Sequence, residues 1–226
     1  MGVQRLAFFD LDNTLIDRQN ALSGWVNEFC ISRDLSDSAC IKMCEELSVR
    51  AYPADFVRLR RELQLAESAD ELWKSYVRGI AARVTCRPGT AQRLGELRAA
   101  GWSLGVITNG AVDIQQAKLK QTGLLGAFDM VCISGEVGVR KPSPEIFEAA
   151  ARRCALPLDG WMVGDNPATD VGGGQAVGLR TLWISGGREW PAGARNPDSI
   201  AEDASAAITY LLEWGYGRQP QSSGIL

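Results

Sequence analysis

Residues 6–14 read LAFFDLDNT, a short apolar run that ends in two aspartates. Four consecutive apolar residues are typical of a strand buried on both faces, as in the middle of a parallel sheet. Asp10 and Asp12 stand two positions apart, so both carboxylates can project from the carboxyl end of this strand. Crowded carboxylates repel one another and resist ionising unless a cation joins them. The stretch therefore predicts a strand end that binds a hard divalent ion such as Mg²⁺.

Further apolar runs of strand type follow at 104–107, 130–133, 161–163 and 181–184. Helical spacing lies between them at Ile146, Phe147, Ala150, Ala151 and Cys154 and, later, at Ile200, Ala204, Ala207, Ile208 and Leu211. Alternating strands and helices predict an α/β fold with a doubly wound, Rossmann-like parallel sheet. Ligands of such sheets bind beyond the carboxyl ends of the strands.

Residues 18–83 interrupt this alternation, because they show helical spacing without any run of strand type. We expect an inserted α-helical cap domain at 18–83 and a discontinuous core at 1–17 and 84–226. Trp25, Trp73 and Tyr76 are expected to pack inside the cap rather than stack on a substrate. The cap carries ten basic and ten acidic residues, so its charge does not single out one ligand. The Arg-Leu-Arg-Arg run at 58–61 is expected to be a solvated helix face.

The composition narrows the chemistry chiefly because the chain has no histidine. Catalytic triads that use histidine and histidine-zinc sites are excluded, so proton transfer falls to carboxylate, Lys, Tyr or Cys side chains. A net charge of −3 without a basic stripe argues against a nucleic-acid partner.

The spacing of the six cysteines and the pattern of apolar residues bear on where in the cell the protein is expected to act. No cysteine pair has C-x-x-C spacing, which predicts buried free thiols in a reducing environment. With no signal-peptide pattern and no membrane-spanning apolar stretch, we expect a soluble, cytoplasmic protein without a membrane partner. The stretch from Gly215 to Leu226 is expected to be a frayed tail.

Polar residues follow the later strands at the same edge of the predicted sheet. Thr108 and Asn109 end the second run before a helix, where a hydroxyl, main-chain amides and a helix N-terminus favour an anion. Lys141 stands just before Ser143 and Pro144, the predicted N-cap and first residue of another helix. We expect these segments to bind phosphate.

The fourth polar segment begins at Asp165, directly after an apolar run. Asn166 and Pro167 repeat the pattern of N-cap and first helical residue, so Asp170 in the first turn can reach back toward Asp165. Three glycines at 172–174 are costly in a helix, at about 1 kcal/mol each relative to alanine. We interpret them as permitting a close approach of helix and sheet.

With these four motifs in this order, the chain resembles the haloacid dehalogenase (HAD) superfamily from Leu6 to about Leu212. The helical insertion is similar to a C1 cap, and residues 10–15 and 135–142 resemble the phosphatase subgroup. The resemblance implies that Asp10 is the nucleophile that forms an aspartyl phosphate. It also implies that Asp12 protonates the leaving oxygen and later activates water.

The same resemblance implies the ligands of the site. Mg²⁺ would be held by the Asp10 carboxylate, the Asp12 main-chain carbonyl and Asp165. Asp170 would contact these ligands and orient them without binding the ion itself. The phosphoryl oxygens would be bound by Thr108, Asn109 and Lys141.

We therefore expect a Mg²⁺-dependent phosphomonoesterase that acts on a small phosphorylated metabolite. Asp12 favours this over dehalogenation, since a leaving halide needs no proton. Two alternatives stay open: a β-phosphoglucomutase-like phosphotransferase, and a non-catalytic phosphate-binding regulatory module. A phosphonate-cleaving enzyme would need a Schiff-base lysine in the cap, where only Lys42 and Lys74 are available. The sequence does not indicate the substrate or the oligomeric state.

Overall fold

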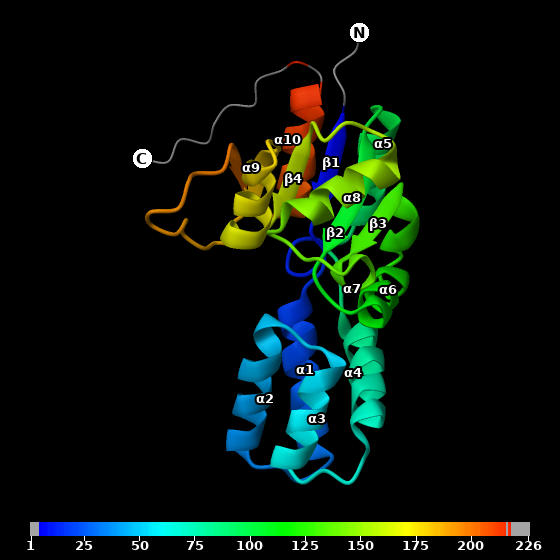
Figure 1. Ribbon diagram of the computed structural model, residues 1–226, viewed down its shortest axis with the longest axis vertical. Coiled ribbons are helices and arrows are strands. Elements are labelled where there is room, and N and C mark those ends of the chain that lie inside the picture. The colour runs from blue at the N-terminus through cyan, green and yellow to red at the C-terminus, as the bar shows by residue number, and fades with distance from the viewer. Residues whose placement is uncertain (1–4, 216, 218–226) are drawn as a thin grey trace. The chain divides into compact units, whose positions relative to one another are not determined.

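The computed structural model describes residues 5–215 and 217 of the chain (Figure 1). Its strands are β1 (Leu6–Phe9), β2 (Ser103–Thr108), β3 (Met130–Ile133), β4 (Trp161–Gly164), β5 (Arg180–Ile184) and β6 (Ser199–Ala201). Its helices are α1 (Arg18–Ile31), α2 (Asp37–Val49), α3 (Pro53–Glu62), α4 (Ala69–Arg83), α5 (Thr90–Ala99), α6 (Val112–Gln121), α7 (Ser134–Val137), α8 (Pro144–Cys154), α9 (Gly173–Ala176) and α10 (Ala204–Gly215). A 3-10 turn, η1 (Leu124–Ala127), and a π-helical turn, η2 (Pro167–Gly172), complete the list. Apart from Gly215 and Gly217, the predicted tail lies outside the described residues.

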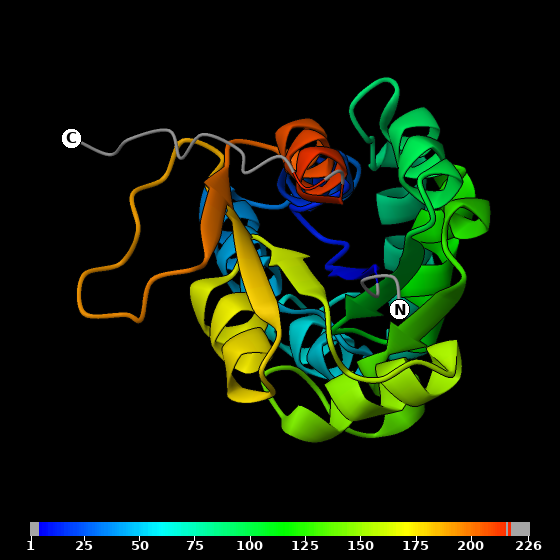
Figure 2. The same ribbon diagram turned by 90° about the horizontal axis from the view of Figure 1, so that it is seen from above.

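The six strands form one parallel sheet in the order β3-β2-β1-β4-β5-β6. Helices cover both faces, with α10 and α8 on opposite sides of the sheet in Figure 2. The predicted doubly wound α/β fold is thus confirmed. β1 lies at the centre, where the chain order reverses between β2 and β4, and such a switch point opens a crevice at the carboxyl ends of the strands.

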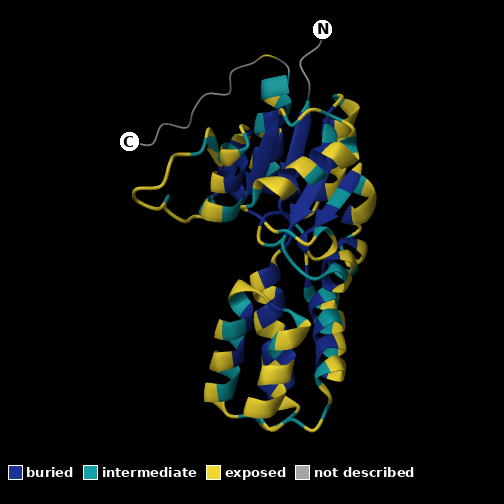
Figure 3. Ribbon diagram, in the orientation of Figure 1, coloured by how far each residue is buried: buried dark blue, intermediate teal, exposed yellow. Residues whose placement is uncertain are grey.

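The sheet is buried on both faces, as the continuous apolar runs predicted. All four residues of β1 are buried, and the central strands are dark blue in Figure 3. Alternate residues face α8, where Phe8, Ile107 and Met162 join Phe147 in one apolar cluster. Burying these side chains stabilises the strands whose ends carry the polar residues.

The end of the chain differs from the prediction. Ile200 was expected to begin a helix, but it lies in β6, and α10 begins only at Ala204. The carboxylate of Asp198 accepts hydrogen bonds from Thr181 N at 2.8 Å and Thr181 Oγ1 at 3.0 Å, which fixes this segment beside β5. A strand of three residues is too short to show a period of its own.

Contacts between residues divide the chain into two compact units. One holds the sheet, and the other comprises Ile16–Cys86 and Gly110–Leu125. This helical unit differs from the expected cap at 18–83 because α6 belongs to it. Trp73 Nε1 of α4 donates to Asp113 Oδ2 of α6 at 2.6 Å, which ties the two helices together.

Aromatic rings fill the interior of the helical unit. The Trp25 and Tyr76 rings meet edge to face with centroids 5.1 Å apart, and Trp73 stacks on Tyr76 at 5.5 Å. All three side chains are buried, so the prediction that they pack within the unit is confirmed. The run at 58–61 is mostly exposed, and Arg58 pairs with Glu46 at 3.0 Å, as expected of a solvated face.

Within residues 5–215, no helix combines the length and the apolarity that crossing a bilayer requires.

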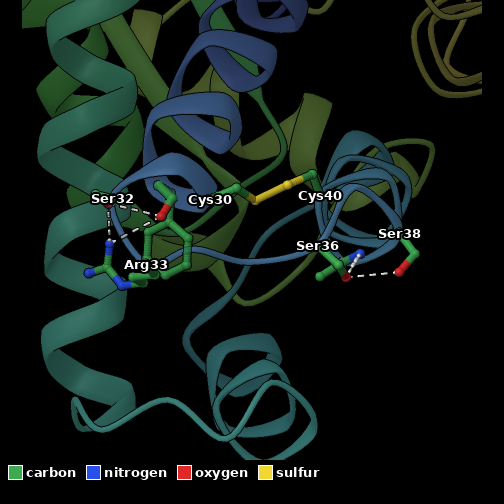
Figure 4. Close-up of a disulfide and its surroundings, with 8 residues drawn as sticks. Cys30, Ser32, Arg33, Ser36, Ser38 and Cys40 are labelled. Carbon is green, nitrogen blue, oxygen red and sulfur yellow. Dashed lines mark hydrogen bonds between the residues drawn. A yellow bond between two sulfur atoms is a disulfide. The ribbon is translucent and has the colours of Figure 1, made fainter.

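The prediction of free thiols is wrong for two of the six cysteines. Cys30 near the end of α1 and Cys40 in the first turn of α2 form a disulfide (Figure 4), with their Cα atoms 6.1 Å apart. The packing of α1 against α2 brings them together, which their spacing of ten residues could not reveal. Cys44, Cys86, Cys132 and Cys154 are free, and of these only Cys132 is buried.

Replacing Cys40 with serine is expected to lower the free energy of unfolding by about 2–3 kcal/mol under non-reducing conditions, because the disulfide closes a short loop in the unfolded chain. Urea titration of the two proteins measures this difference. Cys44→Ser, one helical turn away, is the matched control and should leave the unfolding midpoint nearly unchanged. Alkylation of all six cysteines in the denatured, unreduced protein would contradict the disulfide.

Candidate active site

Two carboxylates lie side by side because adjacent parallel strands end beside each other. Asp10 follows β1 and Asp165 follows β4, and Phe9 is in register with Val163. The main-chain N–H of Asp10 donates to Val163 O at 2.8 Å, which extends the ladder to the site itself. The strand order therefore brings together two motifs that lie far apart in the sequence.

The first turn after β4 contributes a third carboxylate. Asn166 caps η2, since its side chain accepts from Ala168 N and Thr169 N at 3.0 Å each, and Pro167 is the first helical residue. Asp170 turns back as predicted, and the carboxylates of Asp10, Asp165 and Asp170 each offer an oxygen within 4.8 Å of the others.

Lys141 supplies the positive charge of this cluster. Its Nζ lies 2.6 Å from Asp10 Oδ1 and 2.7 Å from Asp170 Oδ1, and its side chain is 1% exposed. The predicted N-cap and first helical residue behind it, Ser143 and Pro144, are confirmed. The Ser143 hydroxyl donates to the Glu145 side chain instead of accepting from the helix main chain.

Burial dominates the electrostatics. It raises the pKa of the Asp10 carboxyl from 3.8 to about 8 against the opposing charge of Lys141, and Asp170 and Asp165 add to this increase. Burial also raises the pKa of Asp165 to about 6, assisted by Asp170 and opposed by Arg188. Without a further cation the cluster therefore retains a proton near neutral pH. Oxygen donors in this arrangement fit Mg²⁺, which would displace that proton.

The ammonium of Lys141 stays charged in spite of its burial. Burial alone would lower the pKa of Lys141, but Asp10 and Asp170 raise it above its usual range. A permanent cation is thus held against the carboxylate that ends β1.

Thr108 and Asn109 end β2, next to β1. Thr108 is fully buried. The Asn109 side chain pairs with the main chain of Lys141, since Nδ2 donates to Lys141 O at 3.0 Å and Oδ1 accepts from Lys141 N at 2.9 Å. Asn109 therefore positions Lys141, a contact that the sequence did not reveal. The expected contacts of Thr108 and Asn109 with phosphoryl oxygens stay predictions.

Asp12 lies in the turn that follows Asp10. Asn13 adopts a left-handed conformation with φ of 60°, and Leu15 N donates to Leu11 O at 3.0 Å, so the chain reverses immediately after β1. Asp12 is half-buried as a residue and stands outside the group formed by Asp10, Asp165 and Asp170. This is compatible with an acid and base that faces a substrate, a role that stays a prediction.

Glycines behind the site permit close approaches. A Cβ at Gly174 would lie 3.0 Å from Met162 and Thr181 of the sheet, so the predicted tight packing of this helix is confirmed there. Gly173 instead approaches Phe147 of α8, and a Cβ at Gly172 would make only an ordinary contact, 3.5 Å from Pro167 O. Gly164, which the sequence did not single out, touches Asp170 so closely that a Cβ would collide with the carboxylate.

Replacing Gly164 with alanine is expected to displace Asp170 and to cost about 1–3 kcal/mol of stability, as overpacking does in a close-packed interior. Gly95→Ala in α5 is the matched control, because a Cβ there meets nothing within 4 Å. That control is expected to stabilise the protein by up to about 1 kcal/mol through helix propensity. Thermal unfolding measures both changes in stability, with a lower unfolding temperature expected for Gly164→Ala and a higher one for Gly95→Ala. Changes of the same sign in the two variants would contradict the prediction.

Arg188 was also not anticipated. It lies in the loop after β5, and its Nη2 donates to Asp165 O at 3.0 Å and Asp165 Oδ2 at 3.2 Å. The only signal in the sequence was a positive residue shortly after β5, the strand next to β4. That position does not reveal where the side chain points.

Known proteins are similar to this chain in sequence and in fold. The sequence profile described as "Hydrolase: haloacid dehalogenase-like hydrolase" matches residues 4–178. The phosphoserine phosphatase of Thermus thermophilus is 40% identical over 124 residues, which cover 54% of this chain and 49% of that protein. The chain thus matches about half the length of this relative. The glyceraldehyde 3-phosphate phosphatase of Pyrococcus furiosus is 29% identical over 201 residues, or 81% of this chain and 82% of that protein.

A solved structure agrees with the fold. The HAD phosphatase from Thermococcus onnurineus superposes with a TM-score of 0.69 at 24% identity, covering 96% of this chain and 100% of that one. At this level of identity the likeness is one of fold alone.

Proposed function

Because the chain belongs to the haloacid dehalogenase-like hydrolases, we propose that it is a Mg²⁺-dependent phosphomonoesterase of small phosphorylated metabolites. The observation that carries this proposal is the buried ammonium of Lys141, held 2.6 Å from Asp10 Oδ1 and 2.7 Å from Asp170 Oδ1. A fixed cation beside a carboxylate suits a reaction in which that carboxylate meets an anionic phosphoryl group. The two phosphatase relatives support the same reaction class.

In the first half of the reaction, a carboxylate oxygen of Asp10 attacks phosphorus. The bond between phosphorus and the leaving oxygen breaks, and Asp12 gives that oxygen a proton. The products are the free alcohol and an aspartyl phosphate on Asp10. Lys141 offsets negative charge on the transferring group, and Thr108 and Asn109 are proposed to donate to its oxygens.

In the second half, water attacks the phosphorus of the aspartyl phosphate. Asp12, now deprotonated, accepts a proton from this water. The bond to Asp10 breaks, inorganic phosphate leaves, and the Asp10 carboxylate is restored.

The donor set fits Mg²⁺. Asp10, the main-chain carbonyl of Asp12, and Asp165 are the proposed ligands. Asp170 suits a supporting role, because its Oδ1 already contacts Lys141 Nζ and its Oδ2 accepts from Asn166 N at 3.0 Å. When bound, Mg²⁺ would supply charge stabilisation to the transferring phosphoryl oxygens.

We also propose that residues 18–83 act as a cap that selects the substrate, and that the protein is cytoplasmic.

A phosphonate-cleaving reaction is disfavoured, since a Schiff-base lysine has to lose its proton readily. Lys42 donates to Glu62 at 2.6 Å, and this hydrogen bond raises the pKa of the lysine. Lys74 is 62% exposed and pairs with Asp70 at 2.6 Å.

The test is a screen for phosphate release from metabolites, including phosphoserine and glyceraldehyde 3-phosphate, with Mg²⁺ and with EDTA. Release that needs Mg²⁺, stops in EDTA and returns with added Mg²⁺ would support the proposal. Interconversion of sugar phosphates without net release would favour the phosphotransferase. Failure of every ester would favour the non-catalytic module.

The affinity for Mg²⁺ is expected to increase between about pH 6 and pH 8.5, by up to about tenfold per pH unit, because the ion has to displace the proton on Asp10. The pKa of Asp10 is raised to about 8, so the dependence should flatten above that pH. The folded chain binds this proton more tightly than the unfolded chain. The metal-free protein should therefore lose stability as the pH rises from about 4 to about 8. Calorimetric titration with MgCl₂ at several pH values measures the affinity, and a constant affinity across this range would disprove the prediction.

A further inference from the structure

The geometry points to Arg188 as a positioning residue that orients Asp165 for a divalent cation. This inference rests on the proposed function, because it assigns a role within the same metal site. Arg188 itself does not touch the reacting atoms. It acts through the orientation of the Asp165 side chain and main chain.

The guanidinium of Arg188 is anchored by the main chain of its own loop. Its Nε donates to Ser185 O at 2.9 Å, and its Nη2 donates to Ile184 O at 3.1 Å. Both carbonyls lie at the carboxyl end of β5. The planar guanidinium is thus fixed at two points before it reaches the neighbouring strand, which a flexible ammonium could not achieve.

The same Nη2 reaches the residue that follows β4. It donates to Asp165 O at 3.0 Å and to Asp165 Oδ2 at 3.2 Å, so it holds the main chain and the side chain together. Trp183 Nε1 adds a second donor to Asp165 O at 2.9 Å. Asp165 is therefore held by two side chains from β5 and the loop behind it.

The two carboxylate oxygens of Asp165 have different surroundings. Oδ2 accepts from Arg188, whereas Oδ1 accepts no hydrogen bond within residues 5–215 and 217. Asp165 also offers an oxygen within 4.8 Å of Asp10 and Asp170. One oxygen thus fixes the rotamer, and the other can serve as the ligand.

Two opposing effects on the affinity for a cation have to be weighed. The charge of Arg188 repels a cation, but its side chain is 53% exposed, so solvent screens this repulsion. The orientation of a ligand by a hydrogen-bonding partner changes metal affinity by about 10- to 100-fold. Orientation therefore outweighs repulsion, and losing Arg188 should weaken the binding of Mg²⁺.

The experiment is calorimetric titration of the metal-free, full-length protein with MgCl₂. Arg188→Ala is expected to raise the Kd for Mg²⁺ about tenfold. Arg188→Lys should raise it by a similar factor, because it keeps the charge but loses the planar fork. Arg195→Ala removes one positive charge from an exposed position of the same loop and is the matched control, with a Kd within about twofold of the wild type. In a phosphate-release assay, half-maximal activity of both Arg188 variants should need about tenfold more Mg²⁺.

An unchanged or lower Kd in Arg188→Ala would overturn the inference, since repulsion would then be the main effect of Arg188. If Arg188→Ala fails to fold in a thermal unfolding scan, Arg188→Lys decides by the same criterion. If the Arg188 variants bind Mg²⁺ more weakly but the wild type releases no phosphate, the proposed function alone would be overturned. A normal Kd in the variants of an active phosphatase would overturn this inference alone. Failure of the wild type to bind Mg²⁺ would overturn it as well.

Discussion

Asp10→Asn is expected to reduce the release of inorganic phosphate at least about 1,000-fold, because the amide oxygen cannot form the aspartyl phosphate. The substitution preserves the size of the side chain, and the amide oxygen can still accept from Lys141 Nζ, which lies 2.6 Å from Asp10 Oδ1 in the native protein. Phosphate release under saturating Mg²⁺ measures the loss, with mass spectrometry to exclude deamidation back to aspartate. Residual Mg²⁺-dependent turnover near the wild-type rate would rule out Asp10 as the nucleophile.

The same variant separates chemistry from folding. Asp10 crowds against two other carboxylates, and burial raises its pKa to about 8, so the ionised form is disfavoured in the metal-free protein. Removing that carboxyl should leave the metal-free unfolding temperature unchanged or higher above neutral pH. Glu148→Gln on the exposed face of α8 is a control that should affect neither activity nor stability. A large fall in the unfolding temperature of Asp10→Asn would mean that its loss of activity reflects misfolding.

Lys141→Met is expected to lower kcat/KM about 100- to 1,000-fold through the loss of phosphoryl stabilisation. Methionine keeps most of the buried volume, whereas alanine would also leave a cavity. The substitution leaves Asp10 and Asp170 without their shared cation, which is expected to destabilise the metal-free protein by about 3–5 kcal/mol. Activity is therefore to be measured with Mg²⁺ at a temperature at which circular dichroism finds the variant folded.

Lys74→Met is the matched control for Lys141→Met. It makes the same chemical change at an exposed lysine that pairs with Asp70 of its own helix. We expect it to retain the wild-type kcat/KM. A near-normal kcat/KM in Lys141→Met would instead show that the buried ammonium is structural.

The sequence could predict which edge of the sheet carries the site, because several polar residues follow apolar runs of strand type. Asp10, Thr108 and Asp165 each stand at the end of a continuous apolar run. In the structure β2 ends at Thr108, and β1 and β4 end one residue before Asp10 and Asp165. Parallel strands bring such ends to one edge whatever their separation in the sequence. Their roles in catalysis follow from the family resemblance and await the substitutions described above.

Other contacts depend on the direction of a side chain, which no local pattern encodes. Arg188 lies four residues beyond the end of β5, and its contact with Asp165 follows from the fold of an exposed loop. The side-chain amide of Asn109 pairs with the main chain of Lys141, a contact separate from its predicted role in binding phosphate. The Cys30–Cys40 disulfide likewise depends on how two helices pack. Each of these required three-dimensional information.

The reciprocal pairing of Asn109 with Lys141 has a consequence for protein engineering. One amide group joins the segment after β2 to the segment that precedes α8, through a donor and an acceptor on the same side chain. A chimaera that takes only one of these segments from a relative therefore inherits half of a matched pair. Grafting schemes that aim to change specificity should exchange the two segments as a single module, because their geometry is specified jointly.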